Sequence, residues 1–240
     1  MALPMNVAPV YTLTIPSTGK EFKYRPFLVK DEKALLIAQQ SEDDVVILDT
    51  IKQVVKSCAI SSIDMETLAS FDIEYIFLKL RAISIGEVVD LYFRCDVDHG
   101  EDNEKAVSLV KVDLTKVEVN KDEPNNPKIN LFNDVGVMMK YPTFDTLKKM
   151  EESNSDELDI IFGIVSDCID YIYTAEEMYP SKDQKKEELI EFLNNLTSEQ
   201  FGKIQEFFKT MPVLRANVEY KCPVCGREHK KYLEGLQSFF

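Results

Sequence analysis

The sequence predicts an α+β fold in which helices pack on small antiparallel sheets. Three observations support this prediction: alternating segments at the start of the chain, two blocks of helical apolar periodicity, and strand-like segments in the middle and at the end. The order of these elements is β, α, β, α, β, without a Gly/Ser linker or a solenoid repeat. This order is typical of helices covering small antiparallel sheets.

Residues 1–30 are expected to form an N-terminal β-hairpin, because two alternating stretches flank a turn that contains Gly19. Residues 31–85 are expected to be a helical block that begins with a helix over residues 30–40. Ser41, followed by Asp44, is interpreted as the N-terminal cap of the next helix. Two apolar faces at helical spacing follow, Ile47, Leu48, Ile51, Val54, Val55 and Cys58, then Ile73, Ile76, Phe77, Leu80 and Ile83.

Residues 86–140 read as a β region, with strands over 87–95 and 107–119 and a strand pair over 129–139. Residues 141–212 are expected to form a second helical block, with Ser181 and Thr197 opening its later helices as capping boxes and Pro212 ending the last one. One wide apolar stripe in this block is interpreted as a single helix face: Leu158, Ile161, Phe162, Val165, Cys168, Ile169 and Ile172. Residues 213–240 hold a strand, a cysteine pair and an aromatic tail. The whole chain is expected to form one or two interwoven domains.

Composition excludes several classes of function. The chain has 240 residues and a formal net charge of -14, so it cannot readily replace counterions on phosphates, and binding to nucleic acid or to an anionic membrane is not expected. No apolar run reaches the roughly 18 residues of a membrane helix, and the N-terminus lacks a secretion signal. The five cysteines are therefore expected to be reduced in a cytosol.

The stretch Cys222-Pro223-Val224-Cys225-Gly226 is typical of half of a structural metal site, most simply for zinc. A tight turn between two ligands lets both reach one ion. The glycine that follows can adopt positive φ, so that backbone N–H groups can point at the sulfurs. Because one such knuckle supplies two ligands and a structural zinc ion takes four, the second half must lie elsewhere in the chain.

The second half is predicted at Cys95 and His99, which also follow an alternating strand and precede a glycine. The predicted ligands are therefore Cys95, His99, Cys222 and Cys225. The spacing of the first pair is not the standard one for a knuckle, so His229 is an alternative ligand to His99, and Asp96 or Asp98 could substitute as well. The site would join the middle of the chain to its end as a zinc-ribbon-like β module. Four protein ligands leave no position for water, which favours a structural role.

No catalytic motif is present: the sequence has no phosphate-binding loop, nucleophile elbow or His-Glu-x-x-His, and its acidic pairs fit helix starts. An enzyme is therefore not expected. Cys58 and Cys168 lie on apolar faces and are expected to be core residues. The terminal Phe239 and Phe240 either fold back on the core or anchor a partner protein, and they are taken as candidate partner-binding residues.

The segments IPSTGKEFKYRPFLVKDEKALLIAQQSEDD and EYKCPVCGREHKKYLEGLQSFF resemble the baseplate hub subunit and hub assembly proteins of T-even-type contractile-tailed phages. The resemblance covers roughly the first sixty and the last thirty residues. It implies a non-enzymatic structural component of the baseplate hub that binds other baseplate or tail proteins, in the virion or in the host cytoplasm during assembly. The alternatives are an assembly chaperone for a hub or tape-measure segment, absent from the mature particle, and an unrelated host zinc-ribbon interaction protein.

Overall fold

The structure is a computed structural model, and it describes residues 7–120, 124–153 and 156–239. The strands are β1 Tyr11–Thr14, β2 Glu21–Tyr24, β3 Val88–Arg94, β4 Val107–Asp113, β5 Glu118–Asn120, β6 Lys128–Phe132, β7 Val135–Met139, β8 Ile169–Tyr173, β9 Met178–Pro180, β10 Val213–Lys221 and β11 Glu228–Glu234. The α-helices are α1 Val29–Ser41, α2 Asp44–Cys58, α3 Ser70–Ser84, α4 Phe144–Glu152, α5 Glu157–Asp167, α6 Lys186–Asn194 and α7 Ser198–Lys209. Short 3-10 helices are η1 Gly100–Lys105, η2 Leu114–Lys116, η3 Ser181–Asp183 and η4 Leu236–Phe239. The α+β class with small antiparallel sheets is confirmed.

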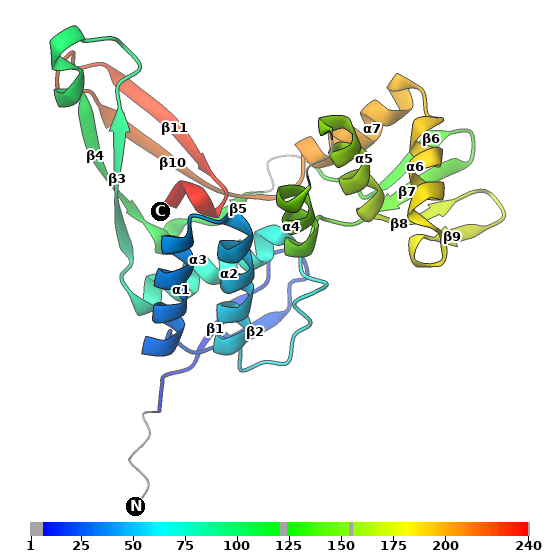
Figure 1. Cartoon of the computed structure of the whole chain (residues 1–240), viewed down its shortest axis with the longest axis horizontal. Coiled ribbons are helices and arrows are strands. Elements are labelled where there is room, and N and C mark those ends of the chain that lie inside the picture. Colours follow the sequence, from blue (N-terminus) through cyan, green and yellow to red (C-terminus); the bar gives the residue numbers. More distant parts are fainter. Residues whose placement is uncertain (1–6, 121–123, 154–155, 240) are drawn as a thin grey trace, which may run out of the picture.

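The chain forms two lobes joined near α4 (Figure 1). The first lobe holds the β1–β2 hairpin, α1–α3 and two long β-hairpins that project together as an arm. The second lobe holds the four-stranded sheet β6-β7-β8-β9 with α5–α7. Ion pairs fasten α4 to α2, because Lys52 contacts Asp145 at 2.8 Å and Lys148 contacts Asp49 at 2.6 Å.

Helix α3 is the centre of the first core. Apolar side chains around most of its circumference are buried, as expected for a helix that is enclosed on all sides. The buried residues around it come from both ends of the chain, from Ile15 near the N-terminus to Phe239 near the C-terminus. The predicted apolar face of α2 is confirmed, with Ile51, Val54, Val55 and Cys58 all buried. The chain therefore cannot complete this core until its last residues are in place.

The second core lies between the four-stranded sheet and α5–α7, and it corrects the expected helical block over residues 141–212. The apolar stripe is not one helix, because α5 ends at Asp167 and the next residues form β8, which pairs with β7 on one side and β9 on the other. Cys168 and Ile169 are buried in the second core, whereas Leu158 remains exposed. Pairing with β7 thus overrides the helical period at Ile169.

Two of the predicted helix caps are wrong and one is confirmed. Asp43, and not Ser41, caps α2: its Oδ1 accepts hydrogen bonds from the N–H groups of Val45 and Val46. Helix α6 begins at Lys186, beyond the expected cap at Ser181. Thr197 does cap α7 as expected.

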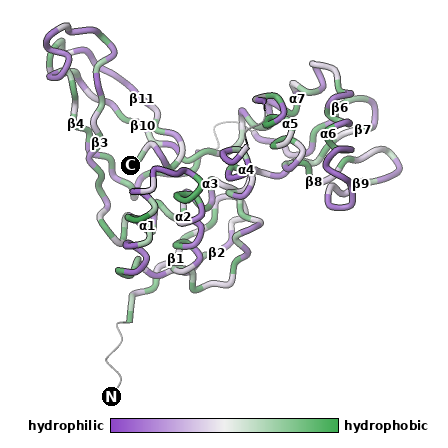
Figure 2. Tube along the Cα trace, in the orientation of Figure 1, coloured by the Kyte–Doolittle hydropathy of each residue, from purple (hydrophilic) through white to green (hydrophobic). Residues whose placement is uncertain are grey.

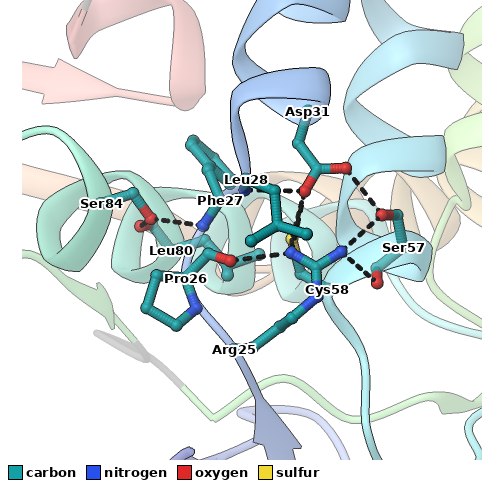
Figure 3. A network of polar contacts seen from close by, with 9 residues as sticks. All are labelled: Arg25, Pro26, Phe27, Leu28, Asp31, Ser57, Cys58, Leu80 and Ser84. Carbon is teal, nitrogen blue, oxygen red and sulfur yellow. Dashed lines mark hydrogen bonds and ion pairs between the residues drawn. The ribbon is translucent and has the colours of Figure 1, made fainter. Parts of the chain in front are cut away.

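A polar network around the buried carboxylate of Asp31 closes the junction between the first hairpin and the helices (Figure 3). Arg25, directly after β2, contacts the carboxylate of Asp31 on α1 at 2.8 Å and donates to the carbonyl oxygen of Ser57 on α2 at 2.9 Å. Ser57 Oγ donates to the other oxygen of Asp31 at 2.7 Å. Burial raises the pKa of Asp31, but hydrogen bonds from Leu28 N–H, Ser57 and Arg25, together with the charge of Arg25, outweigh it, so the pKa of Asp31 lies below its usual value.

The arm consists of the β3–β4 hairpin and the sheet β11-β10-β5. The strand expected over residues 107–119 is interrupted: β4 ends at Asp113, whose carboxylate accepts a hydrogen bond from Thr115 N–H and opens η2, and β5 then pairs with the start of β10. The end of the arm, where β3 passes into β4, is mostly hydrophilic (Figure 2). No helix in the described part of the chain has the length and apolarity to cross a membrane.

Candidate metal centre

The β3–β4 hairpin positions Cys95 and His99 at the end of the arm. Cys95 N–H donates to the carbonyl oxygen of Ala106 at 2.9 Å, which closes the hairpin just beyond β3. Asp98 Oδ1 accepts from Gly100 N–H at 2.9 Å and from Asn103 Nδ2 at 2.7 Å, while Asn103 Oδ1 accepts from His99 N–H at 2.8 Å. Asp98 therefore shapes the loop that presents His99, and its carboxylate is occupied by this task.

The β10–β11 hairpin positions Cys222 and Cys225. Cys222 N–H donates to Arg227 O and Gly226 N–H donates to Cys222 O, both at 2.9 Å, so that the chain reverses within the cysteine pair. Gly226 has φ of 72°, a left-handed conformation that glycine adopts without steric cost. This is the reason for a glycine after the second cysteine.

Three contacts hold the two hairpins together beside the cysteines. Ser108 Oγ on β4 donates to the carbonyl oxygen of Lys221 at 3.0 Å. The ring of Phe93 on β3 stacks on Tyr220 of β10, with centroids 5.2 Å apart, and the Tyr220 hydroxyl donates to Arg94 O at 3.3 Å. These contacts join residues more than a hundred positions apart in the chain, so the two halves of the site meet through tertiary packing.

The four predicted ligands do converge: the ligand atoms of Cys95, His99, Cys222 and Cys225 all lie within 4.8 Å of one another. Cys95 Sγ is 3.9 Å from Cys225 Sγ, and Cys222 Sγ is 3.6 Å from His99 Nε2. A tetrahedral zinc ion, with bonds of about 2.3 Å to sulfur and about 2.0 Å to nitrogen, holds its ligand atoms about 3.5 to 3.8 Å apart. Three thiols and one imidazole at these separations could hold a metal ion.

The electrostatics of the thiols differ within the cluster. Burial raises the pKa of Cys222, but hydrogen bonds from the N–H groups of Cys225 and Val224 and from neighbouring thiols outweigh it and lower the pKa to about 6. Val97 N–H lowers the pKa of Cys95, but burial and the neighbouring sulfurs of Cys222 and Cys225 outweigh it, so that this pKa is raised. Cys222 thus loses its proton readily, and the negative charge of its thiolate opposes the ionisation of Cys95. A bound cation would remove this opposition.

His229, the alternative ligand, lies at the edge of the cluster. Its side chain is buried, its Nε2 is 3.2 Å from Cys95 Sγ, and its Nδ1 is 3.4 Å from Asp96 Oδ2. The ring stacks on Tyr220 with centroids 4.9 Å apart. His229 is outside the group of four ligand atoms, and its position beside Cys95 and Asp96 suits a hydrogen-bonding support of a ligand. The sequence placed His229 near the site but did not reveal its contact with Asp96.

The remaining cysteines lie in the two apolar cores. Cys58 and Cys168 are fully buried. Burial raises the pKa of Cys58 to about 11 and that of Cys168 to about 12, so both stay protonated near neutral pH. Their expected place in the core is confirmed.

For Phe239, one of the two candidate partner-binding residues, the structure shows the alternative in which the tail folds back on the core. The chain turns at Gly235, whose φ is 69°, and η4 then folds back on the first lobe. Phe239 is fully buried in the first core, so its ring is not available to a partner. Phe239 folds back on the core because removing its large apolar ring from water stabilises the folded state. Phe240 lies outside the described residues.

Comparison with known proteins places these features in a family. The family model of the T4 bacteriophage base plate protein matches residues 8–240. The chain is also 24% identical, over 231 residues, to the baseplate hub assembly protein gp26 of Enterobacteria phage T4, an alignment that covers 96% of this chain and 97% of that protein. No solved structure matches. With a match over nearly its whole length, this chain belongs to the T4 bacteriophage base plate protein family.

Proposed function

We propose that this protein acts in the baseplate hub of a contractile phage tail, as a structural component that binds other baseplate or tail proteins. The observation that carries the proposal is the family match from residue 8 to residue 240, together with the full-length relative that is named as a hub assembly protein. Membership of a baseplate family favours a non-enzymatic role. It also leaves the alternative of a host zinc-ribbon protein without support.

The second candidate is an assembly factor that leaves before the particle is complete. The word "assembly" in the name of the phage T4 relative favours this alternative. Both candidates place the protein in the host cytoplasm while tails are being built, and only the first keeps it in the virion tail.

Quantitative mass spectrometry of virions and tail intermediates separates the two candidates. For a structural component, purified virions contain the protein in a fixed ratio to other baseplate proteins. For an assembly factor, the protein co-purifies with hub intermediates from infected cells and is absent from virions. If it were found in neither, a hub role of either kind would be wrong.

Within this role, the cluster of Cys95, His99, Cys222 and Cys225 is proposed to hold one zinc ion as a structural staple. Support comes from the donor set, the separations that suit a tetrahedral ion, and the backbone N–H groups that point at Cys222. Four protein ligands would leave no open position for a substrate. The apolar cluster beside the site is small, with Cys95, Ala106 and Cys222 buried together with part of Val97, so the end of the arm has little other stabilisation.

A further inference from the structure

One edge of β10 is only partly paired. On its first side β10 pairs with β11 from Arg215 to Lys221. On its second side it pairs with β5, and only through Val213, Leu214 and Arg215. Beyond Arg215, no strand in the described part of the chain pairs with this second edge. A strand edge of this kind presents backbone donors and acceptors that another strand can use.

The hydrogen bonds at the two ends of β10 show which residues face this edge. Leu214 O accepts from Gly235 N–H, and Cys222 N–H donates to Arg227 O, so the even-numbered residues point their backbone groups at β11. The odd-numbered residues Asn217 and Glu219 then point theirs the opposite way. Lys221 confirms this direction, since its carbonyl oxygen accepts from Ser108 on β4.

A groove with a volume of about 500 Å³ runs beside this edge, between β10 and the segment from β4 to β5. Five of its lining residues are apolar: Val110, Val112, Val117, Ala216 and Val218. Val110 and Ala216 are half-buried, so their side chains still have apolar surface that an occupant could cover.

The charge of the groove differs from that of the whole protein. Its basic residues, Lys111, Lys116 and Arg215, are balanced by its acidic residues, Asp113, Glu118 and Glu219. The lining therefore has no net formal charge, whereas the chain carries -14. An uncharged occupant with apolar side chains matches this lining better than a basic or an acidic one.

We propose that the groove receives an extended, uncharged segment of another tail protein. This segment pairs with Asn217 and Glu219 of β10 as an added strand, which lies in line with β5 along the same edge of β10. Only a polypeptide in β-conformation offers N–H and C=O groups at the spacing of a strand edge. Its alternate side chains would lie against Val110 and Ala216, the two apolar lining residues that keep exposed surface. The choice of a tail protein as the source rests on the proposed function, whereas the strand addition rests on the geometry of β10.

Two proline variants at directly opposite positions test the edge. Asn217 and Tyr232 face each other across β10 and β11, and both are exposed. In the Asn217→Pro variant the N–H that faces the groove is lost, and the proline ring obstructs an added strand. In the Tyr232→Pro variant the N–H on the far edge of β11 is lost instead. Neither substitution removes a hydrogen bond between β10 and β11, because proline is tolerated where the N–H points away from the partner strand.

The probe is a set of overlapping fluorescent peptides of about eight residues, the length of an ordinary strand, covering the tail proteins of the same phage. Binding to the full-length protein is measured by fluorescence anisotropy. At least one peptide, uncharged and rich in apolar residues, is expected to bind the wild type and the Tyr232→Pro variant alike. The same peptide should bind the Asn217→Pro variant at least about tenfold more weakly. The circular dichroism of both variants is compared with that of the wild type.

A second measurement does not depend on the folding of a variant. Methylation of alternate backbone nitrogens in the bound peptide should abolish its binding to the wild type, since the added strand could no longer donate. The proposal is overturned if no peptide binds the wild type, if methylation has no effect, or if the Asn217→Pro variant binds equally well.

If the wild type self-associates, the Asn217→Pro variant does not, and no peptide binds, the proposal is overturned and the occupant of the groove is a second copy of this chain. None of these results alters whether the protein is found in virions or in hub intermediates, so the hub role fails or stands separately.

Discussion

Replacement of Glu74 by glutamine is expected to stabilise the protein above pH 7. Glu74 lies on α3 beneath the C-terminal turn, where Leu236 N–H donates to its carboxylate. Burial is the larger influence, and it raises the pKa of Glu74 from 4.5 to about 7. A carboxyl group with a raised pKa favours the folded state at low pH, and this contribution is lost as the pH rises from the unfolded-state pKa through the folded-state pKa.

The size of the effect follows from the shift. A difference of about 2.5 pKa units corresponds to at most roughly 3.4 kcal/mol, at 1.36 kcal/mol per unit. Because Glu74 keeps part of its exposure, water offsets some of this cost, and the Glu74→Gln variant should gain about 1 to 3 kcal/mol at pH 8. The gain should fall below about 1 kcal/mol at pH 5, where the folded-state carboxyl is already protonated.

Urea unfolding followed by circular dichroism at pH 5 and at pH 8 measures both values. The control is Glu191→Gln on α6, an exposed position, which should change the free energy of unfolding by less than about 0.5 kcal/mol at either pH. If the Glu74→Gln variant were no more stable than the wild type at pH 8, or if its gain did not shrink toward pH 5, the assigned burial of Glu74 would be wrong.

Four further substitutions test a polar network, two glycine positions and a helix cap. Arg25→Ala should cost about 3 kcal/mol in urea unfolding, because it leaves the carboxylate of Asp31 buried without its cation; a loss below about 1 kcal/mol would contradict the network. Gly136→Ala should cost about 1 to 3 kcal/mol in urea unfolding, since the added Cβ would clash with the Tyr173 hydroxyl and with the carbonyl oxygen of Ile129. Gly202→Ala on α7, with open space around it, should instead stabilise by about 0.5 to 1 kcal/mol. Thr197→Ala should lower stability by about 1 kcal/mol through loss of the α7 cap, and an unchanged urea midpoint would refute that role.

The sequence predicts helices well where one face is continuously apolar. Helices α2 and α3 follow their patterns closely, because both pack on the same core and their buried residues recur at helical spacing. The error at α5 has a different cause. Ile169 and Ile172 fit the helical spacing of the preceding stripe, but they also belong to an alternating segment of β-branched and aromatic residues, Ile169–Tyr173. The strand pattern wins because residues 169–173 pair with β7. A strand pair over residues 129–139 is predicted from the sequence, but its pairing with residues 169–173 is a long-range contact without a local signal.

In the candidate site, too, local features could be predicted from the sequence and most long-range contacts could not. The turn at Cys222 and Cys225 is a local feature, so its geometry could be predicted from the cysteine spacing and Gly226. The convergence with Cys95 and His99 was predicted by analogy between two strand–turn segments, and the structure brings the four ligand atoms together. Whether Phe239 folds back on the core, and whether His99 or His229 lies with the three cysteines, both depend on long-range packing, so the sequence leaves these alternatives open.

Metal analysis of the protein purified without chelators tests whether one ion joins the two hairpins of the arm. We expect about one zinc per chain in the wild type, as for a site with four protein ligands. The Cys222→Ser and Cys225→Ser double variant should contain no zinc and should unfold at lower urea concentration, because binding energy at a structural site is folding energy. The Cys168→Ala control should retain the ion, because Cys168 lies in the second core, away from the cluster. If the double variant contained as much zinc as the wild type, these cysteines would not be ligands and the proposed site would be wrong.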